Sequence, residues 1–216
     1  MSSMTTTQTL RFNLPGKWAR IDLTSEASSR ASIRRLLDQV TNKRDDLAGV
    51  RAELRGRFQK AADLAREGGA VDMRIAQELA KGVPLPAWAT LFEPTIEDED
   101  FARLGITELK QVLDMGTRTS APVGTKEMDS DKIVAIRQSW RRTSHVVEGE
   151  VERDFEIVEA DYWLAAGNPN RVALLTFSTA YADYEEEMLA LFDAVVGTIR
   201  WQSPDEAAEE ESIPAE

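Results

Sequence analysis

The chain has 216 residues, of which 42% are hydrophobic and 30% charged, and its formal net charge is −12. This composition is typical of a soluble chain with one large domain or two small ones, and the negative charge disfavours a nucleic-acid partner. Cysteine is absent, which excludes disulfides, thiolate metal sites and a cysteine nucleophile. No apolar run reaches the roughly 18 residues of a transmembrane helix, and Met1–Thr9 lacks the features of a secretory signal. We therefore expect a cytoplasmic protein with no membrane partner.

The charge is distributed unevenly along the chain. The segment 202–216 carries −6 from acidic residues, has two Pro and contains no Lys or Arg, which predicts a disordered acidic tail. By contrast, the segment 26–67 holds ten Lys or Arg against seven Asp or Glu. We predict a flexible N-terminus over 1–9, a single domain over 10–201 and the tail over 202–216.

The N-terminal third reads as strands followed by helices. Apolar residues alternate over 9–14, which predicts a strand, and Pro15-Gly16 predicts a turn before a second short strand over 17–23. Apolar residues then recur at spacings of three, four and seven, which indicates a helical stripe. A polar break at 41–46, with Asp45 or Asp46 as the next N-cap, predicts two helices over about 27–41 and 46–67.

The central third predicts a hairpin and one more helical region. Alternation over 70–79 and an apolar run over 87–92 predict two strands, joined by a turn rich in Gly and Pro. The segment 95–116 has a helical pattern that is interrupted at Gly105, with Thr95 and Thr107 as candidate caps.

The C-terminal third predicts strands and a final helix. Strand patterns cover 132–136, 145–151 and 154–166, and the last of these should pair antiparallel with 171–177 across a compact turn. The intervening Ser139–His145, with one Trp and two Arg, reads as loop surface or a hairpin tip, and the alternative is a nucleobase or phosphate contact.

The final helix starts with Glu185, Glu186 and Glu187, which match the positive end of its dipole. Asp183 and Glu186 have the spacing of a capping box. This arrangement favours a solvated helix start, with a cation or partner site as the alternative.

No motif in the chain predicts chemistry. His145 is the only histidine and lies near no G-x-S-x-G element, and the acidic run 97–100 lacks the spacing of a calcium loop. Dinucleotide, P-loop and zinc-protease motifs are absent as well. We therefore assign no catalytic residue, no metal ligand and no cofactor.

The C-terminal segment Gly167–Trp201, GNPNRVALLTFSTAYADYEEEMLALFDAVVGTIRW, resembles the ending of PsbP-like proteins from high-GC Gram-positive bacteria, which read like LLTFST…LFDAI…TLRW. The stretches GAVDMRIAQEL…GVPLPAWATLF and FNLPGKWARIDL fit the same pattern, so the resemblance covers about residues 10–201. It implies an α+β fold, an antiparallel β-sheet packed between helices as in the PsbP-like α/β/α sandwich of LpqN and DcrB. Known members mostly bind or stabilise partners, and the absent lipoprotein cysteine removes a surface-lipoprotein role.

Two classes of function remain. The first is a non-catalytic protein-interaction, assembly or chaperone-like module of a bacterial system. The second is a small-ligand binder or an enzyme whose site forms only in three dimensions, which a deep pocket with convergent polar groups would favour. For the first class, the candidate partner-binding residues form a positive strip on the predicted helices, with a solvated face as the alternative: Arg34, Arg44, Arg51, Arg55 and Arg66. The sequence leaves the partner and the oligomeric state open.

Overall fold

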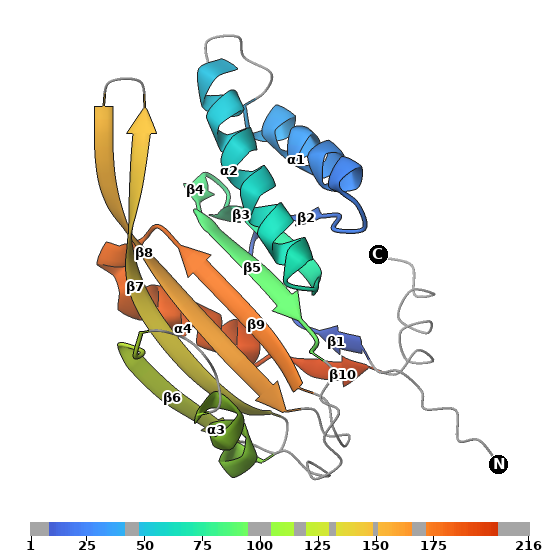
Figure 1. Ribbon diagram of the computed structural model, residues 1–216, viewed down its shortest axis with the longest axis vertical. Helices are drawn as coiled ribbons and strands as arrows, with labels where there is room; N and C mark the ends of the chain where they lie inside the picture. The colour runs from blue at the N-terminus through green and yellow to red at the C-terminus, as the bar shows by residue number, and fades with distance from the viewer. Residues whose placement is uncertain are drawn as a thin grey trace, which may run out of the picture.

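The computed structural model describes residues 9–41, 48–94, 105–114, 120–129, 133–148, 151–165 and 172–202. These ranges contain strands and helices in the mixed order expected of an α+β protein (Figure 1). The strands are β1 (Thr9–Arg11), β2 (Lys17–Ile21), β3 (Ala70–Ala80), β4 (Val83–Pro84), β5 (Ala87–Phe92), β6 (Gly124–Asp129), β7 (Val134–Glu148), β8 (Val151–Ala165), β9 (Val172–Thr179) and β10 (Arg200–Gln202). The helices are α1 (Glu26–Val40), α2 (Ala48–Glu67), α3 (Ile106–Asp114) and α4 (Glu185–Val196), with a 3₁₀ turn over Ala182–Tyr184.

The main sheet is antiparallel and has the strand order β2-β3-β5-β9-β8-β7-β6, with the short β4 paired to β3. The predicted hairpin of β3 with β5 and the antiparallel pairing of β8 with β9 are both confirmed. Separately, β1 pairs with β10. Thr9 and Gln202 are partners in that pairing, so both residues belong to strands.

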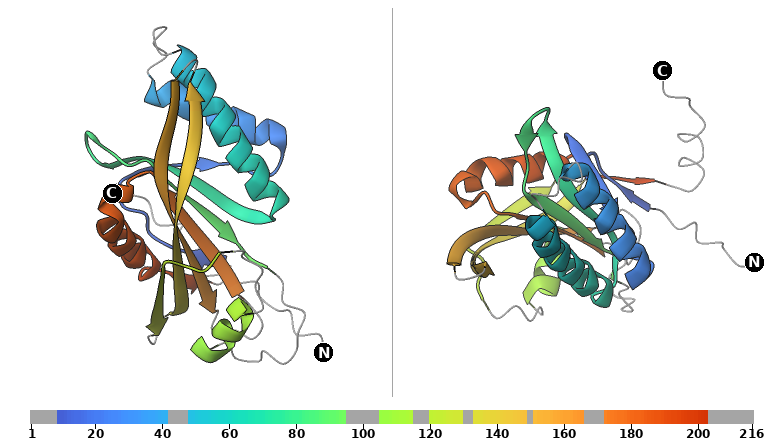
Figure 2. Two further views of the ribbon diagram at one scale, coloured as in Figure 1. Left: turned by 60° about the vertical axis from the view of Figure 1, so that its left-hand side comes forward. Right: turned by 90° about the horizontal axis from the view of Figure 1, so that it is seen from above.

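Helices cover both faces of the sheet, as Figures 1 and 2 show. On one face, α4 packs against β8 and β9 through the largest apolar cluster, which includes Tyr162, Phe177 and Phe192. On the other face, α1 and α2 lie side by side over the β2-β3-β5 end, and α3 packs near β7 and β8. The expected sheet between helices is therefore confirmed.

The helix pair α1 and α2 matches the predicted division closely. Ser25 caps α1, because its side-chain oxygen accepts the Ser28 backbone N–H at 3.0 Å. Ile33 and Leu37 of α1 and Ala62 of α2 are buried against β2 and β3. The break between the helices, including the candidate caps Asp45 and Asp46, lies outside the described residues.

Two predictions in the middle of the chain were wrong. Thr107 does not cap α3, because the helix begins at Ile106 and the backbone N–H of Gly105 donates to the Glu108 carboxylate at 2.9 Å. Ser139–His145 is no loop or hairpin tip, because it forms part of β7 and pairs with β8 throughout. The two long strands continue past their neighbours as a two-stranded arm beside α2, where the Arg57 guanidinium lies 6.0 Å from the centre of the Phe155 ring.

Aromatic stacking fixes α4 on the sheet. The ring of Phe192 stacks on Phe177, with ring centres 4.5 Å apart and planes 10° from parallel, and Tyr162 meets Phe177 edge-on. All three side chains are at most 1% exposed. The predicted capping box is not formed, because Tyr184 occupies the N-cap position and no side chain caps the helix.

A carboxylate that is only 14% exposed adds polar contacts to this packing. Asp193 of α4 accepts hydrogen bonds from Tyr162 Oη at 2.8 Å and from Lys126 Nζ at 2.7 Å. Arg137 Nη1 donates to both carboxylate oxygens, at 2.9 and 2.8 Å. Burial, together with the negative charge of Asp193, raises the pKa of Tyr162 far above its ordinary value. The helix is thus tied to three neighbouring strands, β6, β7 and β8.

Replacing the stacked ring should be far more damaging than neutralising an exposed carboxylate on the same helix. We expect Phe192→Ala to lower the free energy of unfolding by about 3–5 kcal/mol, because it leaves a cavity in the core. Glu186→Gln, at an exposed position, should cost less than about 1 kcal/mol. Chemical denaturation of the two variants measures both values, and the reverse ranking would contradict this account of α4.

The raised pKa of Tyr162 predicts a loss of stability at alkaline pH. The unfolded tyrosine releases its proton above about pH 10 while the folded one retains it, so stability falls as the pH rises. Tyr162→Phe should therefore lower stability at neutral pH by roughly 1.5–3 kcal/mol, through the lost bond to a charged group. Above pH 10, the free energy of unfolding of Tyr162→Phe should fall less steeply with pH than that of the unsubstituted protein. The difference in slope should be up to about 1.4 kcal/mol per pH unit. Urea denaturation between pH 7 and 11 tests this, with Tyr184→Phe, at an exposed position, as the control; equal slopes would refute it.

Candidate functional site

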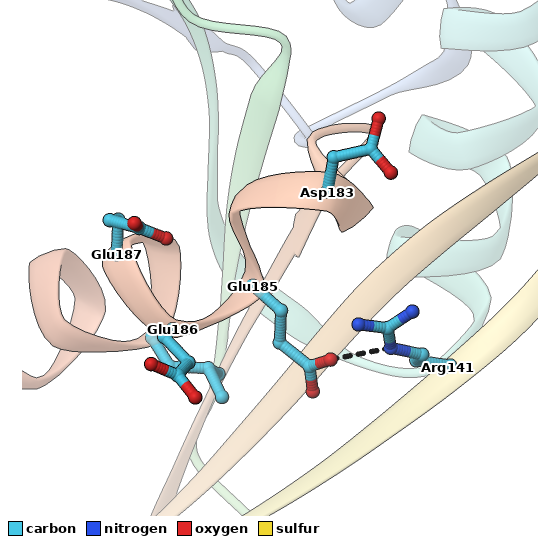
Figure 3. Close-up of a pocket in the computed structure, with 6 residues that line it drawn as sticks. Arg141, Asp183, Glu185, Glu186 and Glu187 are labelled. Atoms are coloured by element: carbon cyan, nitrogen blue, oxygen red, sulfur yellow. Dashed lines mark hydrogen bonds and ion pairs between the residues drawn. The ribbon is translucent and has the colours of Figure 1, made fainter.

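The surface has two open hollows at places that the sequence analysis singled out, the acidic start of the last helix and the arginine-bearing helices α1 and α2. The first, of about 490 Å³, lies at the start of α4 and is lined by acidic residues and Arg141 (Figure 3). The second, of about 720 Å³, lies between α1 and α2.

The acidic hollow is held together by an ion-pair network. Arg141 Nε donates to the Glu185 carboxylate at 2.5 Å, and its Nη1 donates to Glu156 at 3.1 Å. These contacts with Glu185, followed by those with Glu156, raise the pKa of Arg141. The Glu185 side chain is only 17% exposed, so this residue is not the solvated carboxylate that we expected.

The other carboxylates do not converge on a common point. Figure 3 shows Glu186, Glu187 and Asp183 pointing in different directions, with only Glu185 turned to Arg141. Within the described ranges, no cluster of three or more acidic or histidine side chains has the geometry to hold a metal ion. The ion pairs at the first hollow join the start of α4 to β7 and β8.

The hollow between α1 and α2 is a shallow groove with a regular lining. From α1 it is lined by Ala27, Arg30, Ala31 and Arg34, and from α2 by Ala52, Arg55, Gly56 and Gln59. Each set has the offsets 0, 3, 4 and 7, which place its members on one face of a helix. Small residues thus alternate with long polar ones on both walls. We call this surface the α1/α2 groove.

The arginines of the groove differ in their partners. Arg30 is paired with Glu26 one turn earlier on α1. Arg34 and Arg55 are exposed, and among the described residues neither has an ion pair or a hydrogen-bond partner. Two guanidinium groups on facing helices are therefore available to an anionic partner.

The remaining predicted strip residues are engaged elsewhere. Arg51 donates to Thr41 Oγ1 at the end of α1, with a distance of 3.4 Å. Arg66 forms an ion pair with Asp63 at 3.0 Å, and Arg44 lies outside the described residues. Of the predicted strip residues that the structure describes, Arg34 and Arg55 line the groove, and Arg30 is a lining residue that the sequence reasoning missed.

Gly56 is the unusual member of the groove. It lies in the middle of a 20-residue helix, where glycine costs roughly 0.5–1 kcal/mol relative to alanine. A Cβ atom added at this position would meet no atom within 4 Å, so the packing of the protein does not require glycine there. The absence of a side chain leaves the α2 backbone open at this position.

The other residues considered from the sequence are not among the described residues that line the two hollows. His145 lies in β7 opposite Asp154, and the acidic run 97–100 lies outside the described residues.

Comparison with known proteins adds no assignment: no protein-family model and no curated protein sequence matches the chain significantly. None of the helices that the structure describes is both long and apolar enough to span a bilayer.

If the fold does not require Gly56, alanine at this position should make the protein more stable. We expect Gly56→Ala to raise the free energy of unfolding by about 0.5–1 kcal/mol, because alanine has the higher helix propensity and meets no steric obstacle. Gly49→Ala, in the first turn of the same helix and equally unobstructed, is the matched control and should not destabilise the protein. A loss of stability in Gly56→Ala, measured by urea denaturation, would show that the fold itself needs this glycine.

Proposed function

We propose that this protein is a non-catalytic interaction module that binds an acidic segment of a protein partner in the α1/α2 groove. In keeping with its resemblance to PsbP-like proteins, we place it in an assembly or chaperone-like role in the bacterial cytoplasm. The proposal assigns recognition to Arg34 and Arg55, with Arg30 as a third contact, and close approach to Gly56.

One observation supports this proposal above the others. Two arginines without partners in the described structure stand on opposite walls of a groove whose remaining lining is largely Ala and Gly. A guanidinium presents a planar fork of donors that matches a carboxylate, and small residues between such forks leave room for a peptide backbone.

The charge of the whole molecule makes this feature informative. In a chain of net charge −12, an acidic partner is repelled by most of the surface. A local pair of uncompensated arginines therefore selects where such a partner docks. Exposed ion pairs are worth about 0–1 kcal/mol each, so binding at this groove would be weak and sensitive to salt.

The test titrates the full chain with a fluorescein-labelled peptide of alternating Glu and Ala pairs and follows its anisotropy at low salt. Combining Arg34→Glu with Arg55→Glu should weaken binding at least about tenfold, since two attractive contacts become repulsive. Gly56→Leu should weaken it comparably by filling the groove. Lys60→Glu makes one such charge reversal at an exposed position of α2 outside the groove, so it is the control for each arginine reversal taken singly.

Equal losses in Lys60→Glu and in the arginine variants would show that only net charge matters, and the groove proposal would then be wrong. Normal binding by Gly56→Leu would remove the assigned role of close approach.

A further inference from the structure

We infer that the acidic segment 203–216 of this same chain is a ligand of the α1/α2 groove and competes there with the partner. The inference rests on the proposed function for the identity of the groove. It makes the groove self-regulated, with the chain supplying its own weak competitor.

Charge complementarity is the first argument. The segment contains acidic residues and no Lys or Arg: Asp205, Glu206, Glu209, Glu210, Glu211 and Glu216. The first two acidic pairs, 205–206 and 209–210, are separated only by Ala207 and Ala208, so no bulky side chain stands between them. The carboxylates of the segment can pair with the guanidinium groups of the groove, and its alanines fit against the small residues that line it.

The length of chain is the second argument. The described chain ends at Gln202, which is held in β10 by pairing with Thr9 of β1. From that anchor, the segment 203–216 extends at most about 46–50 Å. A compact domain of about 190 residues has a radius of gyration of roughly 16 Å, and its diameter is more than twice that radius. The fully extended segment is therefore about as long as the domain is wide.

Tethering is the third argument. A segment joined to the domain that it contacts has an effective local concentration of order millimolar. Contacts as weak as exposed ion pairs then suffice for partial occupancy of the groove. Partial occupancy lowers the apparent affinity for an external partner in proportion to the fraction of grooves that are blocked.

The absence of cysteine makes the test direct. In the full chain, Glu210→Cys carries a nitroxide spin label, and the broadening of backbone amide signals is measured by NMR. We expect selective broadening of α1 and α2 amides next to the groove, at residues 27–34 and 52–59, which disappears at high salt. Combining Arg34→Glu with Arg55→Glu should abolish it, and Lys60→Glu should leave it unchanged.

A mixed sample separates tethered from intermolecular contact. Spin-labelled chains without isotope enrichment are mixed with ¹⁵N-enriched chains that carry no spin label. If the segment contacts the groove of its own chain, the signals of the ¹⁵N-enriched chains should not broaden in this mixture. Uniform or absent broadening in the single-chain sample, or equal broadening in the mixture, overturns the inference.

Peptide affinity then distinguishes this inference from the proposed function. Replacing the acidic residues of 205–211 by Asn and Gln in the full chain should tighten binding of the Glu-Ala peptide about two- to tenfold at low salt. If the spin label reports no contact but the peptide still binds through Arg34 and Arg55, the inference fails and the proposed function stands. If the label reports the contact but the peptide never binds, the proposed function fails while the segment remains the ligand of the groove.

Discussion

The packing of α4 on the sheet is the constraint from which the rest of the structure follows. Phe192 stacks on Phe177, and Asp193 one residue later binds Tyr162, Arg137 and Lys126, so apolar and polar contacts hold the same turn of helix. With this face of β8 and β9 covered by α4, the apolar residues on the opposite face need a second layer of helices. That layer consists of α1, α2 and α3.

The second layer explains why a groove exists. Apolar side chains of α1 and α2 turn to β2 and β3, which fixes the two helices next to each other. The residues at the meeting of their outer surfaces then decide how deep the hollow between them is. Four of these positions hold alanine or glycine, whose small size leaves space between the helices. Arg30 and Arg34 of α1 and Arg55 of α2 make the edges of the groove positive.

Much of this fold could be predicted from the sequence because helical stripes and strand alternation reflect burial. The exceptions have physical causes. Ser139–His145 looked like a loop because Trp140 is its only large apolar residue, and because the β7–β8 arm runs past the ends of β6 and β9 from Arg142 onward. The edge strand β6, with sequence GTKEMD, has the charged composition of a protected edge and no apolar alternation. The partner of β1 is β10, a pairing between the two ends of the domain that no local pattern could reveal.

The groove was partly predictable for the same reason. Local charge identified Arg34 and Arg55, but charge alone could not tell them from Arg51 and Arg66. Arg51 contacts Thr41 at the end of α1, and Arg66 pairs with Asp63 one turn earlier on α2. The stronger signal was the shared spacing of Ala27-Arg30-Ala31-Arg34 and Ala52-Arg55-Gly56-Gln59, which repeats small and polar residues on both helices. A helix interior that retains glycine where alanine fits gives up stability without any gain in packing. Because folding does not account for that loss, the contact that it permits is best sought outside the folded core, at a chain that lies against α2.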